Sequence, residues 1–170
     1  NAATGSATAD VELQRGDGAG VDVGRDASHA QFIGCVFTGT NHGILNQGGA
    51  SFCVVDGCEF YNFAGGTDTA IAYGTATSVA LPLQWQIKNS VFFNNVRHIV
   101  HPFSSATIYG NTFGFIGSTI TTTIIYDATS GKNNSIWNNK VQCASDAGGI
   151  TAAVVLGTAD SWGPQFYTDV

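Results

Sequence analysis

One short pattern returns five times along this chain and limits what the chain can fold into. It consists of a β-branched or aromatic residue, a variable residue, Gly or Asn, a small residue, a variable residue, and finally Phe or Val. The copies span residues 32–37 (FIGCVF), 55–60 (VDGCEF), 87–92 (IKNSVF), 108–113 (IYGNTF) and 136–141 (IWNNKV). A fixed motif at irregular spacing is typical of a solenoid that carries loop insertions. The repeats therefore predict stacked coils.

Each copy predicts a strand that runs into a bend. In the fourth copy we expect Ile108 and Phe113 to face inward, and Tyr109 and Thr112 to face outward. Gly or Asn fits the bend because both tolerate a positive φ. The next position is small and mostly polar, and we expect its members to hydrogen-bond along the stack: Cys35, Cys58, Ser90, Asn111 and Asn139.

A second strand is expected after each copy. These segments lie at residues 43–47, 70–74, 98–102, 123–127 and 153–157, and similar segments at 11–14 and 20–24 precede the first copy. Two apolar columns result. One contains Ile44, Ile71, Ile99, Ile124 and Val154, and the other contains Leu45, Ala72, Val100, Ile125 and Val155. The sequence leaves open which column faces outward. An outward apolar column predicts an interface, and we take Leu45, Ala72, Val100, Ile125 and Val155 as its candidates.

Helical periodicity is missing, and the spacing leaves no room for helices between strands, which predicts an all-β parallel β-helix. From about residue 20 to residue 157 the pattern resembles the right-handed parallel β-helix of pectin-lyase-like proteins, which include polysaccharide lyases, glycoside hydrolases, epimerases and phage tailspikes. The resemblance implies a right-handed solenoid of about five to six coils. We expect one domain over residues 1–170, with core coils at about 11–158 and a capping tail at 159–170, as a fragment of a larger protein.

The composition narrows the range of partners. Only 11% of the residues are charged, the net charge is −6, and the six basic residues are scattered. Nucleic-acid binding relies on clustered Lys and Arg, so we expect no nucleic-acid partner. The chain contains no run of about 18 apolar residues, which a membrane-spanning helix would need, so we expect no membrane insertion.

One outer column carries the candidate ligand-binding residues. Asp56, Lys88, Tyr109 and Trp137 fall on successive rungs, and Glu59 is expected on the same face as Asp56. Two interpretations remain open. The column is either a sugar-binding strip, or a salt bridge between neighbouring rungs beside an ordinary aromatic stack.

The candidate catalytic residues are Asp56, Glu59, Lys88 and Arg97. Asp56 and Glu59 form the nearest acidic pair of the kind glycosidases use. The resemblance to polysaccharide lyases implies a basic residue, for which Arg97 together with His98 is the best group, but the acidic calcium cluster of such enzymes is missing. We expect no metal and no cofactor.

Cys35 and Cys58 occupy the same motif position in consecutive copies. Stacked rungs bring such Cα atoms to roughly 4.8 Å, which a disulfide spans. Buried thiols are the alternative.

Two functions follow as hypotheses. The first is a structural and receptor- or glycan-binding β-helix of a surface-displayed spike or fibre. The resemblance to phage tailspikes implies a virion or extracellular location, a homotrimer and a cell-surface polysaccharide as ligand. The alternative is a carbohydrate-active enzyme, a polysaccharide hydrolase or lyase.

Overall fold

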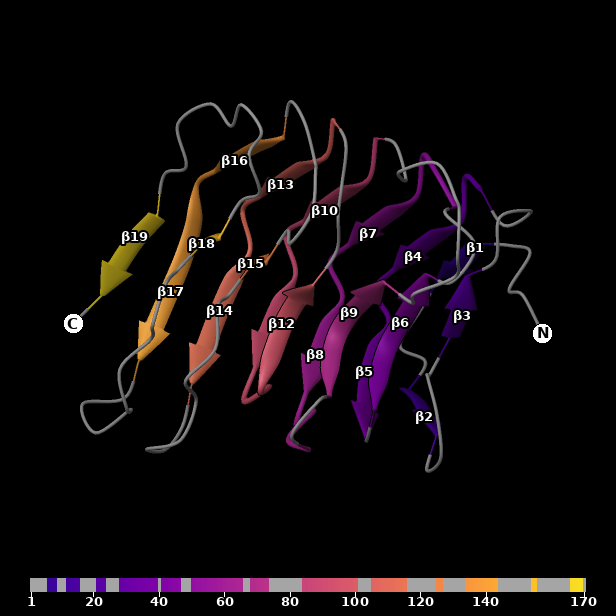
Figure 1. Cartoon of the computed structure of the whole chain (residues 1–170), viewed down its shortest axis with the longest axis horizontal. Helices are drawn as coiled ribbons and strands as arrows, with labels where there is room; N and C mark the ends of the chain where they lie inside the picture. The colour runs from indigo at the N-terminus through magenta and orange to yellow at the C-terminus, as the bar shows by residue number, and fades with distance from the viewer. Residues whose placement is uncertain are drawn as a thin grey trace.

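The computed structural model describes residues 6–8, 12–15, 21–23, 28–39, 41–46, 50–65, 68–73, 84–100, 105–115, 125–126, 134–143, 154–155 and 166–169. Within these residues the chain is all-β, with strands in three parallel sheets and no helix. The strands lie side by side along the long axis of the molecule, from the N-terminus to the C-terminus (Figure 1).

The first two sheets hold the repeated motif. Sheet A contains, in spatial order, β1 (Ser6–Thr8), β4 (Gln31–Ile33), β7 (Val54–Asp56), β10 (Gln86–Lys88), β13 (Thr107–Tyr109) and β16 (Ser135–Trp137). Sheet B contains β2 (Glu12–Arg15), β5 (Val36–Gly39), β8 (Glu59–Tyr61), β11 (Val91–Phe93), β14 (Thr112–Phe115), β17 (Asn139–Cys143) and β19 (Phe166–Asp169). Each motif copy therefore supplies one strand to sheet A and the next strand to sheet B.

The third sheet holds the second strands that follow the motif. Sheet C contains β3 (Val21–Val23), β6 (His42–Asn46), β9 (Thr69–Tyr73), β12 (Arg97–Val100), β15 (Ile125–Tyr126) and β18 (Val154–Val155). From β4 to β18 the chain enters sheets A, B and C in turn, and every pairing is parallel. This order is consistent with a parallel β-helix.

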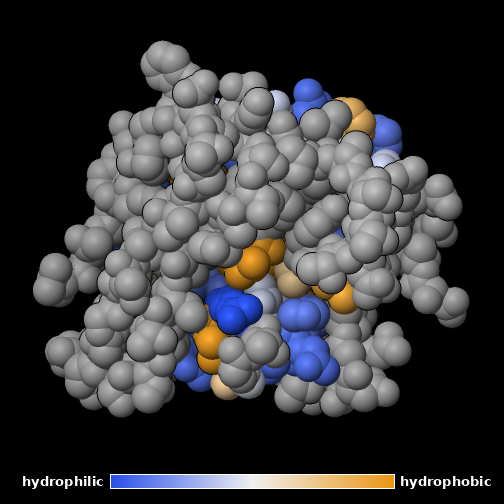
Figure 2. Space-filling model, viewed as in Figure 1, coloured by the Kyte–Doolittle hydropathy of each residue, from blue (hydrophilic) through white to orange (hydrophobic). Residues whose placement is uncertain are grey.

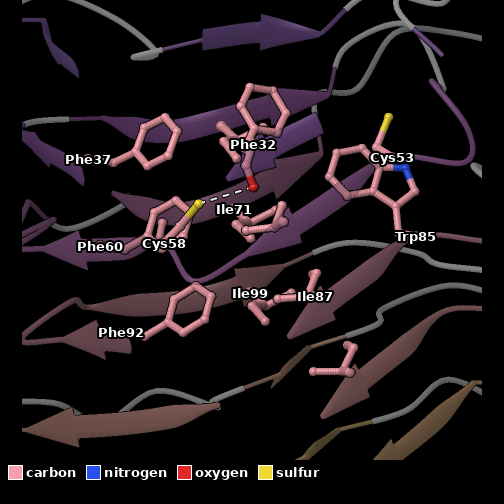
Figure 3. Packing of buried hydrophobic residues seen from close by; sticks show 14 of the residues in the cluster. Phe32, Phe37, Cys53, Cys58, Phe60, Ile71, Trp85, Ile87, Phe92 and Ile99 are labelled. Atoms are coloured by element: carbon pink, nitrogen blue, oxygen red, sulfur yellow. Dashed lines mark hydrogen bonds between the residues drawn. The ribbon is translucent and has the colours of Figure 1, made fainter. Parts of the chain in front are cut away.

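The core is made of inward-facing columns, one from each sheet. Its buried members are Phe32, Val55, Ile87, Ile108 and Ile136 from sheet A, Phe37, Phe60, Phe92, Phe113 and Val141 from sheet B, and Ile44, Ile71 and Ile99 from sheet C. The four phenylalanines stack with ring centroids 4.7, 4.7 and 5.0 Å apart, close to the spacing of neighbouring strands. Figure 3 shows three of these rings in one column. The facing predicted for Ile108 and Phe113 is confirmed.

The corner between sheets A and B follows the motif. Its first residue has a positive φ in every described copy, at Gly34, Gly57, Asn89, Gly110 and Asn138. The next residue forms the predicted ladder, because the Ser90 N–H donates to Asn111 Oδ1 over 3.0 Å. The Asn111 N–H in turn donates to Asn139 Oδ1 over 3.1 Å. The amide nitrogen of each asparagine donates to a core carbonyl, that of Ile87 or Ile108.

One expectation about the later strands of sheet C needs correction. In sheet C the register pairs Ile99 with Ile125 and Val100 with Tyr126, so Ile125 belongs to the column of Ile99. When two neighbouring residues are both β-branched, either one fits the inward column, so the sequence does not exclude a register that is shifted by one residue. This ambiguity explains the error. At the C-terminal end, within the segment expected as a cap, β19 pairs with β17 and continues sheet B.

Candidate functional site

The outer column of sheet A has the composition and the order that the sequence predicts. Parallel pairings place its members on successive strands in the order Ile33, Asp56, Lys88, Tyr109 and Trp137. Their neighbours Phe32, Val55, Ile87, Ile108 and Ile136 point into the core. The alternation of a β-strand therefore holds these five side chains on one outer face.

A compact polar group occupies the middle of this column. Lys88 Nζ lies 3.3 Å from Asp56 Oδ2, and Asn89 Nδ2 donates to Asp56 Oδ1 over 2.9 Å. Both charged side chains remain partly exposed, so the ion pair contributes less than about 1 kcal/mol to stability. Its formal charges cancel, which leaves a hydrogen-bonding group without net charge.

Two aromatic rings continue the column towards the C-terminal end. Tyr109 and Trp137 stack with centroids 4.9 Å apart and an interplanar angle of 2°. Trp137 is 40% exposed, which is high for a residue type that is usually well buried. Both interpretations of the sequence share this geometry: neighbouring rungs are ion-paired and stacked, and the pairs form a polar and aromatic surface.

Glu59 does not share the face of Asp56. It lies in β8 of sheet B, because the chain turns at Gly57 and Cys58. Its Oε2 accepts a hydrogen bond from Tyr61 Oη over 2.5 Å. That bond, then burial and the charge of Glu59, raise the pKa of Tyr61 to about 12. The expected pair of carboxylates on one face is therefore replaced by two carboxylates on different sheets, each with its own partner.

The expected basic group of Arg97 and His98 is divided between two faces. These residues are neighbours on β12, and His98 points inward and is fully buried. Burial lowers the pKa of His98 to about 3, so its imidazole is neutral at pH 7. Asn95 Nδ2 lies 3.2 Å from its Nδ1. Arg97 and Lys88 belong to different sheets, and His101 lies outside the described residues.

Arg97 instead lies in one row with His42, because each pairs with Thr69 in sheet C. Burial lowers the pKa of His42, the nearby Asp68 and a backbone contact at Thr69 oppose this, and Arg97 adds to it. Asp68 is buried and accepts a hydrogen bond from the Gly65 N–H over 2.8 Å. These groups lie at the start of the sheet C strands.

The outer column of sheet C carries the expected interface residues. Ile44, Ile71 and Ile99 are the inward column, which answers the question that the sequence left open. Leu45 and Val100 are half-buried and Ala72 is buried. Val155 pairs with Tyr126, and their side chains lie outside the described set. In the view of Figure 2, hydrophobic and hydrophilic groups are intermixed over the described surface.

Cys35, Cys53 and Cys58 are buried thiols, not disulfides. The Cys58 Sγ–H donates to the Phe32 carbonyl over 3.3 Å (Figure 3). Burial raises the pKa of Cys53 and of Cys58 to about 11, which makes both thiols poor nucleophiles.

The sequence reading missed the corner between sheets C and A. Four copies of its first residue are described, and all four have a positive φ although none of the four is Gly or Asn: His29, Phe52, Gln84 and Ser105. His29 and Phe52 are exposed and stack with ring centroids 4.9 Å apart and an interplanar angle of 10°. Because these four positions lack Gly and Asn, their residue types do not indicate a turn. They can be located only by counting residues back from the start of each sheet A strand.

Within the part of the chain that the structure describes, no group of three His, Cys, Asp or Glu side chains is arranged to hold a metal ion. No described helix is long and apolar enough to cross a membrane. Comparison with known proteins finds no matching family model, no matching curated protein and no matching solved structure.

Proposed function

We propose that the outer face of sheet A binds a glycan, and that this chain is a glycan-binding segment of a surface-displayed spike or fibre protein. One observation carries the proposal. The stacked rings of Tyr109 and Trp137 continue the same outer column as the group formed by Asp56, Lys88 and Asn89.

The chemistry of a sugar matches this combination. A pyranose ring presents apolar C–H groups on its faces and hydroxyl groups around its rim. Aromatic rings bind the apolar C–H faces, and groups that donate and accept hydrogen bonds bind the hydroxyls. The Lys88 ammonium has three N–H donors and the Asp56 carboxylate has about four acceptor sites, so their mutual contact leaves capacity for hydroxyls. Because the ion pair and the ring stack already restrict these side chains, less conformational entropy is lost on binding.

The architecture belongs to the proposal as well. We take the fold to be a right-handed parallel β-helix of about five to six coils. Connections between parallel strands of one sheet are right-handed in about 98% of cases, which supports this hand. The resemblance to phage tailspikes supports a virion or extracellular location.

Binding to polysaccharides tests the central claim. The chain is passed over immobilised dextran, galactomannan, laminarin, polygalacturonate and alginate, together with Trp137→Ala and Tyr61→Ala variants. We expect at least one polysaccharide to retain the chain, the Trp137→Ala variant to lose retention, and the Tyr61→Ala variant on sheet B to keep it. The proposal fails if no polysaccharide retains the chain. Release of reducing ends in the same mixtures would instead indicate the polysaccharide-cleaving alternative.

A homotrimer that meets through the outer column of sheet C is the proposed assembly. Leu45, Ala72 and Val100 make the middle of that column apolar, and a charge there would be buried without a partner in a trimer. We expect light scattering to give a trimer, and a Val100→Asp variant to dissociate it. Thr38→Asp on sheet B is the control. A monomeric chain at micromolar concentration would contradict this assembly.

A further inference from the structure

The corner between sheets C and A carries side chains that its backbone conformation disfavours. A positive φ costs most L-residues roughly 1–2 kcal/mol relative to glycine, and Phe52 nevertheless adopts a value of 60°. His29 has a φ of 70°, and His is found in this region more often than most residues. The other two corners place Gly or Asn at nearly every such position. The backbone therefore gives no reason for the Phe52 ring.

Their surroundings suggest what the rings do. Phe52 is 40% exposed, the same fraction as Trp137. The strands that follow this corner belong to sheet A, so the His29–Phe52 pair borders the face that carries Tyr109 and Trp137. Between the two aromatic pairs, Gln86 is exposed and offers an amide that donates and accepts.

The two aromatic pairs lie too far apart for one sugar ring. Phe52 precedes Asp56 by four residues, and the strand of Tyr109 lies two strands beyond that of Asp56. At about 3.3 Å per residue and about 4.8 Å per strand, the offset is at most roughly 13 Å across the face and roughly 10 Å along the axis. A ligand that touches both pairs must contain several sugar units.

The charge of the face indicates the kind of sugar. Among the described side chains of sheet A that point outward, the formal charges are those of Asp56 and Lys88, which pair with each other. The rest are amides, hydroxyls, rings or aliphatic groups. The whole chain carries a net charge of −6, which repels polyanions. The face therefore suits an uncharged glycan better than a uronate or sialylated polymer.

We propose that sheet A binds an extended, uncharged oligosaccharide through two aromatic subsites, Tyr109–Trp137 and His29–Phe52. This inference rests on the proposed glycan-binding function and adds the class and the minimum length of the ligand.

The variants separate the ring from the backbone. Phe52→Asn removes the ring and keeps a residue that tolerates positive φ, and Phe52→Trp restores a ring. Gln84→Asn makes a similar change at the same corner without deleting a ring, so it serves as the control. The probes are enzymatically trimmed fragments of dextran, galactomannan and laminarin, from two to eight sugar units long, with polygalacturonate fragments as the charged comparison.

Titration calorimetry gives the readout. We expect neutral fragments to bind and polygalacturonate fragments not to bind. Phe52→Asn should weaken binding of the longest fragments roughly 3- to 10-fold, the range expected for one aromatic contact, and leave the shortest fragments unchanged. Trp137→Ala should weaken both, and Phe52→Trp and Gln84→Asn should behave like the unaltered chain.

The failures are distinguishable. Binding of polygalacturonate fragments that depends on Trp137 would keep the glycan-binding function and overturn the uncharged ligand. Equal binding by the Phe52→Asn variant and the unaltered chain at every length would overturn the second subsite. Absence of binding by all fragments and polymers would overturn the proposed function itself.

Discussion

The corner between sheets A and B and the corner between sheets C and A perform the same turn with different residues. At the first corner, Gly57 and Asn89 have a positive φ at little cost, and small side chains behind them form a ladder inside the coil. At the second, Phe52 and Gln84 adopt the same region although their side chains disfavour it. At the first corner the residue types fit the backbone conformation. At the second corner they do not, so we attribute them to the contacts that their side chains can make with a ligand.

The interior of the two corners differs as well. Behind the first corner, Ser90 and Asn111 are buried polar residues that satisfy backbone groups. Behind the second, most buried members are apolar: Ala30, Cys53, Trp85 and Ala106. Polar ladders depend on every member, whereas apolar packing tolerates change better. A volume-conserving substitution behind the first corner should therefore cost more than one behind the second.

The largest expected effect is at the ladder. Asn111→Ala leaves the Ser90 N–H and the Ile87 carbonyl without their partner inside the coil. Because one buried unsatisfied group costs about 1–3 kcal/mol, we expect the free energy of unfolding to fall by about 2–4 kcal/mol. Urea unfolding measures the change. Thr112→Ala, on the outer face of the next strand, should cost less than about 0.5 kcal/mol. A loss below about 1 kcal/mol in Asn111→Ala would mean that the ladder does not hold the corner.

The next effect appears with pH and concerns the corner between sheets B and C. Asn95 contacts the buried His98, whose pKa falls from 6.5 to about 3 on burial. Below pH 6.5 the unfolded chain binds a proton that the folded chain does not, so the free energy of unfolding decreases as the pH falls towards 3. We expect a slope of up to about 1 kcal/mol per pH unit from His98.

Urea unfolding at pH 7, 6 and 5 measures this slope. A His98→Phe variant keeps a ring beside Phe92 and Phe113 but does not titrate, and the other histidines are the same in both proteins. The slope of the unaltered chain should exceed that of the variant. Equal slopes would show that His98 is not held neutral in the core.

A smaller effect isolates the backbone at the first corner. Gly57 has a φ of 62°, and a Cβ added there would meet no atom within 4 Å. Gly57→Ala therefore tests conformation without a clash, and we expect a loss of about 1 kcal/mol from the left-handed region. Gly57→Asn should lose less, because Asn tolerates this region. Thermal unfolding of the two variants compares them, and equal losses would count against a conformational cause.

The first corner could be predicted from the sequence because its demands appear as residue types. Gly or Asn marks the turn and a small residue marks the ladder, so the motif contains both. The alternation of Tyr109 and Trp137 with core isoleucines gave the outer column for the same reason. The placements of Glu59 and His98 were missed, since linear spacing does not show on which sheet, or on which side of a strand, a residue falls after a bend.

The smallest expected effect bears directly on the second corner. Gln84 is exposed and has a φ of 52°. Gln84→Gly relieves roughly 1–2 kcal/mol of conformational cost and adds roughly 0.5–1 kcal/mol of unfolded-chain entropy, so we expect a gain of about 0.5–1 kcal/mol in the free energy of unfolding. Urea unfolding of Gln84→Gly and Gly57→Ala should give changes in the free energy of unfolding of opposite sign, although both residues occupy the first position of their corners. If Gln84→Gly instead destabilises the chain, the second corner is not strained, and Phe52 needs no reason beyond packing to be there.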